Sequence, residues 1–513
     1  MKSATTILTC LLVFSATAQT VSMVKDINPG SGSSEIKEAV ALNGKLYFSA
    51  LEPQSGRELW ISGGIPSNTV LKDIQVGSQS SEPAGFQLLD GTVYFKAKVP
   101  PSSQNKERMM RIQGGSSTPE VFAPELVTRR DSAYSNDISK AVNVAIGSLH
   151  TTTRTIYFSS TYGITGQELW KWYQAEWGNL AGTSSGWSWA PPILVKDINP
   201  TGDSDPRNFT TLNGKTYFTA DNGVNGRELW VTDGTPTGTS LLKDINPGAP
   251  SSGITGFVVM GSKLYFTATT ASHGAELWYT DGTTAGTVLV KDINTKKAST
   301  LVSVTGPTLG SKPTGLMVWK NKLYFSADNG TNGEELWCSD GTAAGTVMLK
   351  DINATGSSSP KNFSGYIRQG QDPVTKQIVN QQFLTFTAND GTTGEELWRS
   401  DGTAAGTVLL KDVKAGTSGS SPSELRGLNT STIAGATTIT HYYYSAIGGN
   451  NGRELWEFHP LSNTHKKVSP PVAPNTNPLG QAHNWPWVQM GNALYFYANY
   501  DSNGGELWKV SRP

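Results

Sequence analysis

The segment Arg227-Glu-Leu-Trp-Val-Thr-Asp-Gly-Thr-Pro-Thr-Gly-Thr-Ser-Leu-Leu-Lys-Asp-Ile245 decides the fold, because its parts recur along the whole chain. Four copies run from Glu-Leu-Trp through Asp-Gly-Thr-x-x-Gly-Thr to Lys-Asp. A self-similarity of roughly fifty residues indicates a repeat architecture, which takes precedence over any shorter motif. The Glu-Leu-Trp triplet occurs eight times, beginning at Glu58, Glu168, Glu228, Glu276, Glu335, Glu396, Glu454 and Glu506.

Each repeat contains four short runs of β-branched and aromatic residues, separated by turn signals such as Asn213-Gly214 and Asp233-Gly234. Such spacing is typical of successive antiparallel hairpins. Apolar positions follow a period of two, and 55 glycines interrupt the chain too often for long helices. The repeat therefore predicts a four-stranded antiparallel unit.

The number of units follows from the second strand, which carries a Tyr-Phe-like pair. Glu-Leu-Trp matches eight of the nine units, and Glu107-Arg108-Met109 resembles a decayed ninth copy. We predict nine units, with eight as the alternative if the degenerate second unit merges with a neighbour. The pairs stand at Tyr47-Phe48, Tyr94-Phe95, Tyr157-Phe158, Tyr217-Phe218, Tyr265-Phe266, Tyr324-Phe325, Thr385-Phe386, Tyr443-Tyr444 and Tyr495-Phe496.

The two ends of the repeat region complement each other. The chain opens with a closing strand, Val24-Lys25-Asp26-Ile27, and finishes at Glu506-Leu507-Trp508 in a unit that lacks one. Pairing of Ser22–Ile27 beside Glu506–Val510 would hide the sheet edges by closing a ring. We therefore predict an all-β fold in which residues 19–513 form a single β-propeller of about nine four-stranded blades. An open β-solenoid, which needs atypical capping repeats, is the runner-up.

The Glu and Lys of the clean repeats are fifteen residues apart, as in Glu228 and Lys243. If they face each other across the hairpin, Leu229 lies opposite Leu242 and Trp230 lies opposite Leu241. We expect the Glu and Lys to form a structural pair, and Leu229 and Trp230 to pack on neighbouring blades from opposite sheet faces.

The repeated string resembles the ELWxxDGT repeat family of secreted bacterial proteins, and the resemblance covers nearly all of the chain after its first residues. It implies a repeat β fold and export. It implies no established activity, and therefore transfers no functional residues.

The first eighteen residues have the features of a signal peptide. Lys2 precedes an apolar stretch from Ile7 to Phe14, and Ala16-Thr17-Ala18 fits a signal-peptidase site. A lipoprotein signal ending at Cys10 fits less well, because apolar sequence continues beyond it. We expect residues 1–18 to be cleaved near Ala18–Gln19 and the protein to be secreted or extracytoplasmic.

Composition bounds the partners. Lys plus Arg and Asp plus Glu are both 41, so the formal net charge is zero, which argues against nucleic acid or an anionic membrane as the partner. No later stretch is long enough to span a bilayer. Without Cys10, Cys338 is the remaining cysteine, so an internal disulfide is not expected. We expect a monomer.

Calcium is the best-motivated cofactor, although our prediction is that no cofactor is bound. Loops that begin at Asp221, Asp328 and Asp501 place side-chain oxygens at alternate positions, as calcium loops do. None has a complete twelve-residue spacing with a closing Glu. The alternative, which we favour, is a polar hairpin whose Asx side chains bond their own backbone.

Function in such a ring is expected in loops that depart from the repeat. The largest departure, Trp172 to Pro192, lies between the third and fourth strands of the third unit, and a Pro- and Asn-rich one spans Pro470 to Trp487. Clustered aromatics outside a repeat can stack on sugar rings or anchor a protein. They can equally fold onto their own blade. The candidate binding residues are Trp172, Tyr173, Trp177, Trp187, Trp189, Trp485 and Trp487.

Two functions remain open. The first is an exported, non-catalytic scaffold that binds protein or glycan at the cell surface through its face loops. The second is an exported glycan-active enzyme, a glycosidase or lyase, with two carboxylates about 5–10 Å apart contributed by different blades. We favour the first, because the sequence contains no evident acid/base pair or nucleophile constellation, and we name no catalytic residue.

Overall fold

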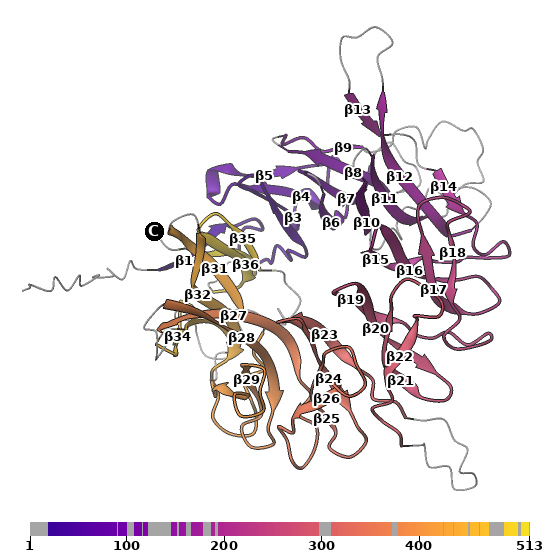
Figure 1. Ribbon diagram of the computed structural model, residues 1–513. Coiled ribbons are helices and arrows are strands. Elements are labelled where there is room, and N and C mark those ends of the chain that lie inside the picture. Colours follow the sequence, from indigo (N-terminus) through magenta and orange to yellow (C-terminus); the bar gives the residue numbers. More distant parts are fainter. Residues whose placement is uncertain are drawn as a thin grey trace, which may run out of the picture.

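The computed structural model is an all-β ring (Figure 1). It describes residues 19–89, 91–99, 107–114, 116–121, 145–150, 153–160, 166–177, 186–189, 193–296, 309–371, 378–423, 425–433, 436–449, 452–460, 462–470, 487–500 and 504–511. The strands group into nine antiparallel sheets, each the core of one blade, so the nine-blade prediction is confirmed and the eight-blade alternative is wrong.

The blades follow one another in sequence order. Blades 1 to 3 comprise β2 (Ala39–Leu42), β3 (Lys45–Glu52), β4 (Gly56–Ser62) and β5 (Thr69–Lys72); β6 (Ala84–Leu89), β7 (Thr92–Lys98), β8 (Glu107–Gln113) and β9 (Glu120–Val121); and β10 (Ala145–His150), β11 (Thr153–Ser160), β12 (Glu168–Trp177) and β14 (Ile193–Lys196). A fifth strand, β13 (Gly186–Trp189), extends blade 3, and one 3-10 turn, η1 (Pro66–Asn68), precedes β5.

Blades 4 to 6 comprise β15 (Arg207–Leu212), β16 (Lys215–Asp221), β17 (Arg227–Thr232) and β18 (Ser240–Lys243); β19 (Thr255–Met260), β20 (Lys263–Thr270), β21 (Gly274–Thr280) and β22 (Val288–Lys291); and β23 (Thr314–Trp319), β24 (Lys322–Asp328), β25 (Glu334–Ser339) and β26 (Val347–Lys350). Blades 7 to 9 comprise β27 (Lys361–Gln371), β28 (Ile378–Asn389), β29 (Glu395–Ser400) and β30 (Val408–Lys411); β31 (Arg426–Ile433), β32 (Ala436–Ile447), β33 (Arg453–His459) and β34 (Thr464–Lys467); and β35 (Val488–Met490), β36 (Ala493–Ala498), β37 (Glu506–Ser511) and β1 (Thr20–Lys25).

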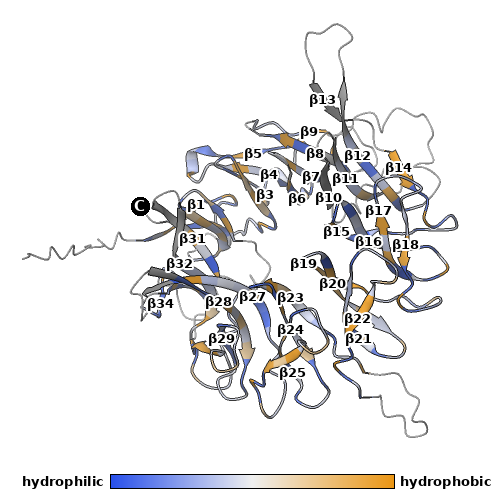
Figure 2. Ribbon diagram, viewed as in Figure 1, coloured by the Kyte–Doolittle hydropathy of each residue, from blue (hydrophilic) through white to orange (hydrophobic). Residues whose placement is uncertain are grey.

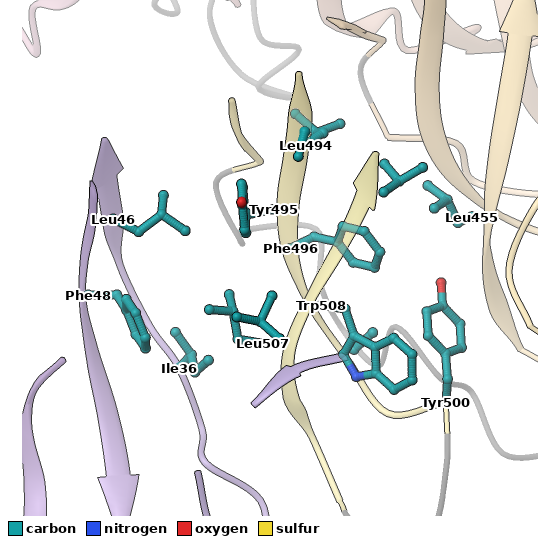
Figure 3. Close-up of a cluster of buried hydrophobic side chains, with 14 of the residues drawn as sticks. Ile36, Leu46, Phe48, Leu455, Leu494, Tyr495, Phe496, Tyr500, Leu507 and Trp508 are labelled. Carbon is teal, nitrogen blue, oxygen red and sulfur yellow. The ribbon is translucent and has the colours of Figure 1, made fainter. Parts of the chain in front are cut away.

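The N-terminal strand closes the ring, as predicted. β1 pairs antiparallel with β37, from Thr20 opposite Ser511 to Lys25 opposite Leu507. Val24 is 1% exposed and belongs to a core shared by blades 8, 9 and 1. Figure 3 shows part of this core, with Phe496 and Trp508 among the apolar side chains at the closure.

Blade 2 is the degenerate one, and its register differs by one residue from our alignment. Ala97 pairs with Arg108 and Phe95 with Met110, where blade 1 pairs Ala50 with Glu58. Arg108 therefore occupies the position of the repeat Glu, and the decayed copy is Arg108-Met109-Met110.

Each blade packs on its two neighbours through opposite sheet faces. In blade 4, Phe218 and Trp230 pack against blade 3, whereas Tyr217 and Leu229 pack against blade 5, which confirms the predicted alternation. Burying one such side chain contributes on the order of 1.5–3 kcal/mol. Figure 2 shows apolar residues gathered on strands such as β18, β22 and β25.

The Asp-Gly turn of the repeat makes room for a neighbouring tyrosine. Gly282 has φ +99°, and a Cβ there would lie 2.5 Å from the hydroxyl of Tyr217 in the preceding blade. The hydroxyl of Tyr324 stands in the same relation to Gly402, at 3.1 Å. Glycine is required at this position by its backbone conformation and by the close approach of the ring.

The predicted hairpin register is correct at the Trp and wrong beyond it. Trp230 pairs with Leu241, but Leu229 pairs with Lys243, because a β-bulge inserts Leu242 as an extra residue. The same shift occurs in blades 5, 6 and 7. The repeat Glu is consequently not opposite the repeat Lys.

The repeat Glu is buried and fixes the connection to the next blade. Glu335 is 0% exposed, and its carboxylate accepts hydrogen bonds from the N–H of Ile352 at 2.7 Å and from the N–H and hydroxyl of Ser358 at 3.0 and 2.7 Å. Ile352 follows the fourth strand of blade 6, and Ser358 leads into blade 7. The same arrangement holds Glu58 to Ile74 and Ser81.

The repeat Lys bonds to the following blade instead of to the Glu. Lys350 Nζ donates to the carbonyl of Thr407 at 2.6 Å, and Lys291 Nζ to that of Thr346 at 2.7 Å. The predicted Glu–Lys pair is therefore wrong in these repeats. Blade 8 does contain a Glu–Lys ion pair, between Glu454 and Lys467 at 3.0 Å. Lys467 follows Glu454 by thirteen residues and lies in a fourth strand whose sequence departs from the repeat.

The meander gives the ring two distinct faces. The turns between strands 1 and 2 and between strands 3 and 4 lie on one face, which we call the turn face. The loops between strands 2 and 3 and the connections between blades lie on the other, the loop face. Neighbouring blades share this orientation. On the turn side, Lys171 Nζ of blade 3 reaches the carbonyl of Gly234 in blade 4, and on the loop side the N–H of Ser252, which leads into blade 5, reaches the carbonyl of Arg227 in blade 4.

A double-mutant cycle tests the separate roles of Glu335 and Lys350. Glu335→Ala leaves buried N–H donors unpaired and should lower the free energy of unfolding by about 1–3 kcal/mol per donor. Lys350→Ala should cost about 1 kcal/mol. The two losses, measured by denaturant unfolding, should add to within about 0.5 kcal/mol. A coupling energy above about 1 kcal/mol would show that the two side chains act as a pair.

Candidate functional site

The aromatic insertion of blade 3 forms a hairpin that continues past the blade. β12 has ten residues, whereas the corresponding β17 has six. Trp172 and Tyr173 still pair with β11, opposite Ile156 and Thr155. Beyond them, Gln174 to Trp177 pairs with β13 alone among the described residues. Figure 1 shows β13 projecting from the outer rim of the ring.

Three of the candidate tryptophans belong to this hairpin. Trp189 pairs with Gln174, Trp187 with Glu176, and Trp177 with Gly186. The backbone thus brings Trp177, Trp187 and Trp189 into one short two-stranded ladder.

Tyr173 lies at the base of the hairpin and is half-buried. Lys171 Nζ stands 5.3 Å from the centroid of its ring and donates to the carbonyl of Gly234 in blade 4 at 2.7 Å. Burial lowers the pKa of Lys171. The base of the hairpin is therefore tied to the next blade by a cation that also covers an aromatic ring.

The second group of aromatic candidates begins beside the ring closure. Trp487 stacks on Phe496 with ring centroids 5.3 Å apart, and packs against the core at the ring closure. Trp485 lies outside the described residues. Trp487 is partly buried and packs beside the first-to-last blade junction.

Two further hairpins depart from the repeat, and we did not predict them as a site. In blade 7, β27 from Lys361 to Gln371 pairs with β28 from Ile378 to Thr387. In blade 8, β32 has twelve residues. Phe383 stacks on Tyr366 at 5.1 Å, and the guanidinium of Arg399 lies 4.8 Å from the Phe383 ring. The signal in the sequence was the lengthened spacing between Lys361 and the Thr385-Phe386 pair.

Blade 8 also gathers titratable groups on one sheet face. His441 and His459 have ring centroids 5.1 Å apart, and His441 Nε2 is 3.8 Å from Glu457 Oε1. The hydroxyl of Tyr443 is 3.3 Å from the same oxygen. The described residues nevertheless contain no group of three His, Cys, Asp or Glu side chains arranged to hold a metal ion.

The calcium-like loops bond their own backbone. Asp221 Oδ1 accepts a hydrogen bond from the N–H of Gly223 at 2.7 Å, and Asp328 Oδ1 accepts one from Gly330 at 2.6 Å. Asp501 lies outside the described residues. These contacts are those of the polar hairpin alternative, in which each Asx side chain stabilises its own turn.

The buried repeat glutamates have perturbed acidity. Burial raises the pKa of Glu168, Glu228 and Glu506 to about 7, and this outweighs the lowering by hydrogen bonds from their N–H and hydroxyl donors. The negative charge of Asp244, which belongs to the Lys-Asp-Ile of the same repeat, raises the pKa of Glu228 further. Each of these carboxyls serves an interblade connection, so the perturbed pKa has a structural origin here.

The described part of the chain contains no helix long and apolar enough to cross a membrane.

Comparison with known proteins shows no family relationship for this chain. No family model and no curated protein matches the chain. Solved propellers do, among them puromycin hydrolase, with 11% identity, a TM-score of 0.35 and coverage of 93% of this chain and 61% of that one. Sqt1 from Chaetomium thermophilum, bound to the N-terminus of ribosomal protein L10, is 10% identical, with a TM-score of 0.36 over 82% of this chain and 94% of that one.

The propeller domain of the Trilobed protease from Pyrococcus furiosus, which has an open velcro topology, is also 10% identical, with a TM-score of 0.30 over 74% and 98% of the two chains. The chain spans 50% of a prolyl endopeptidase and 61% of puromycin hydrolase. At these identities and TM-scores the matches carry no conclusion about the function of this chain.

The raised glutamate pKa values predict that stability depends on pH. A carboxyl whose pKa is raised from 4.5 to about 7 in the folded state contributes stability that is fully present below pH 4.5. That contribution is lost as the pH rises toward 7 and beyond. The melting temperature should therefore fall between pH 5 and about pH 8.

Glu228→Gln should reduce this slope, and Glu120→Gln, whose side chain is 49% exposed, should leave it unchanged. A melting temperature that rises over the same range would contradict the assignment.

Proposed function

We propose that the protein is an exported, non-catalytic propeller that binds a protein or glycan partner, with the β12/β13 hairpin as its principal contact. The observation that carries the proposal is the hairpin itself. It extends beyond the four-stranded blade, and its backbone places three tryptophans in a single ladder. Export rests on the features of residues 1–18 and on the resemblance to secreted repeat proteins.

The physical argument concerns the cost of ordering such a segment. Fixing one backbone residue costs about 1–2 kcal/mol of conformational entropy. A hairpin outside the ring does not offset this cost by burying side chains in the core of the ring. Tryptophan and tyrosine provide large contact areas with few rotatable bonds, which suits them to stacking on sugars or filling protein pockets. A binding role for the hairpin accounts for these residues better than a role in blade stability.

The carboxylates of the repeat support a structural role over catalysis. Glu276 accepts hydrogen bonds from the N–H groups of Ile293, Asn294 and Ser311 at 2.8–3.1 Å. Its lone pairs are thereby committed to holding the connection between blades. We propose the same for its sister residues.

Deletion of residues 174–190 with a short Gly-containing turn in their place tests the proposal. Because the hairpin lies outside the ring core, the melting temperature should change by less than a few degrees. Both proteins are tested on a panel of immobilised neutral and acidic glycans and cell-surface proteins. The deletion variant should fail to bind every partner that the full chain binds. The double variant Trp187→Ala/Trp189→Ala, which keeps the backbone, should lose the same partners.

A strong loss of thermal stability on deletion would show that the hairpin belongs to the core. Retention of every partner by both variants would place binding elsewhere on the ring.

A further inference from the structure

We propose that one face of the β12/β13 hairpin, the face that carries Trp172, Trp187 and Trp189, binds an uncharged linear polysaccharide. We call it the tryptophan face. This inference rests on the proposed function, because it takes the hairpin as the contact of the ring with its partner. It narrows that partner to one chemical class.

The register of the hairpin divides its residues between two faces. Directly opposed residues of an antiparallel pair lie on the same face, and the faces alternate along each strand. Trp187 therefore shares a face with Trp189, whereas Trp177 lies on the other. Trp172 joins Trp189, because it precedes Gln174, the partner of Trp189, by two positions. The tryptophan face comprises Trp172, Gln174, Glu176, Trp187 and Trp189, and the opposite face comprises Tyr173, Ala175, Trp177, Gly186 and Ser188.

The opposite face is turned toward blade 4. Lys171, two positions before Tyr173 on the same strand, donates from Nζ to the carbonyl of Gly234 in that blade. The Lys171 ammonium also lies 5.3 Å from the centroid of the half-buried Tyr173 ring. The tryptophan face is therefore turned toward the side of blade 2, whose outer strand β9 has two residues where β18 has four. The cation of β12 thus serves the opposite face.

The tryptophan positions follow one another at a regular interval. Same-face neighbours on one strand are about 6.6–6.8 Å apart, and diagonal neighbours on paired strands are about 7–8 Å apart. Trp187 and Trp189 are same-face neighbours, and Trp172 is the diagonal neighbour of Trp189. Indole rings repeated at such an interval suit a ligand made of repeated flat units, and the apolar faces of successive sugar rings are units of this kind.

The size of the face favours a polysaccharide over a protein. The paired part of the hairpin has four residues on each strand, which span about 13 Å in length and about 10 Å in width. It therefore offers on the order of 100–150 Å² on one face. A stable protein interface buries about 800 Å² on each partner. A face this small suits a narrow polymer that lies along it.

The polar residues of the tryptophan face favour an uncharged ligand. Glu176 is the one ionisable residue among the five that make up the face. An ionised carboxylate accepts hydrogen bonds from sugar hydroxyls and repels carboxylates and sulfate esters. The amide of Gln174 offers both a donor and an acceptor. A hydroxyl-rich, uncharged chain suits both residues, whereas an acidic chain meets a like charge.

The test compares single variants on the two faces of the same hairpin. Trp187→Ala and Trp189→Ala change the tryptophan face, and Trp177→Ala, the matched control, changes the opposite face. Glu176→Gln removes the charge with little change in shape. The probes are a soluble β-glucan, a mannan and a dextran, all uncharged, and polygalacturonate as the acidic polymer, each titrated at low salt and at about 0.15 M salt. Melting temperatures establish that every variant is folded.

We expect the unmodified chain to bind at least one of the three uncharged polymers, and to bind it more tightly than polygalacturonate. Trp187→Ala and Trp189→Ala should each weaken that binding about tenfold, whereas Trp177→Ala should change it by less than about twofold. Glu176→Gln should reduce the preference over polygalacturonate about threefold or more at low salt, a change that a purely structural role of Glu176 would not produce.

Three results would overturn the inference: no binding to any of the three uncharged polymers, equal weakening by Trp177→Ala and Trp187→Ala, or tighter binding to polygalacturonate. A chain that binds a protein through the hairpin and none of the uncharged polymers would also overturn it, but would leave the proposed function standing.

Discussion

The buried carboxylate of the repeat Glu is the constraint on which the ring depends. It accepts hydrogen bonds from N–H groups at the end of its own blade and at the start of the next. Glu58, for example, accepts them from Ile74 and Ser81. A buried carboxylate is tolerated only where several donors satisfy it, and hydrogen bonds to charged groups contribute about 1.5–3 kcal/mol each. In the blades that carry this Glu, the path to the next blade is therefore set by one side chain, which explains why Glu-Leu-Trp is the most persistent part of the repeat.

Much of the fold could be predicted from the sequence, because the alternation of apolar residues and the repeated turn residues indicate the strands and their packing faces. Period-two alternation placed Leu229 and Trp230 on opposite faces, and the complementary ends located the closing strand. The partners of the Glu and Lys could not be predicted, because the bulge at Leu242 shifts the register by one residue. A spacing of fifteen residues does not distinguish a regular hairpin from a bulged one.

The candidate site was only partly accessible to the same reasoning. An insertion of tryptophans outside the repeat is visible in the sequence, and its position between the third and fourth strands is confirmed by β12 and β14. Trp487 looks similar in the sequence, yet its ring is partly buried and stacks on Phe496 at the ring closure, a contact that only the fold shows. The contact of the Arg399 guanidinium with the Phe383 ring joins residues from different strands, which become neighbours only in the folded ring.

Hydrogen exchange of individual backbone amides tests the central claim most directly. If the repeat carboxylates hold the interblade connections, the N–H groups of Ile74, Ile352 and Ser358 should exchange as slowly as those within the strands, through unfolding of the ring alone. Exchange at these amides as fast as at exposed loop residues such as Thr331 would contradict the account. It would show that the connections open locally and that the buried Glu does not fix them.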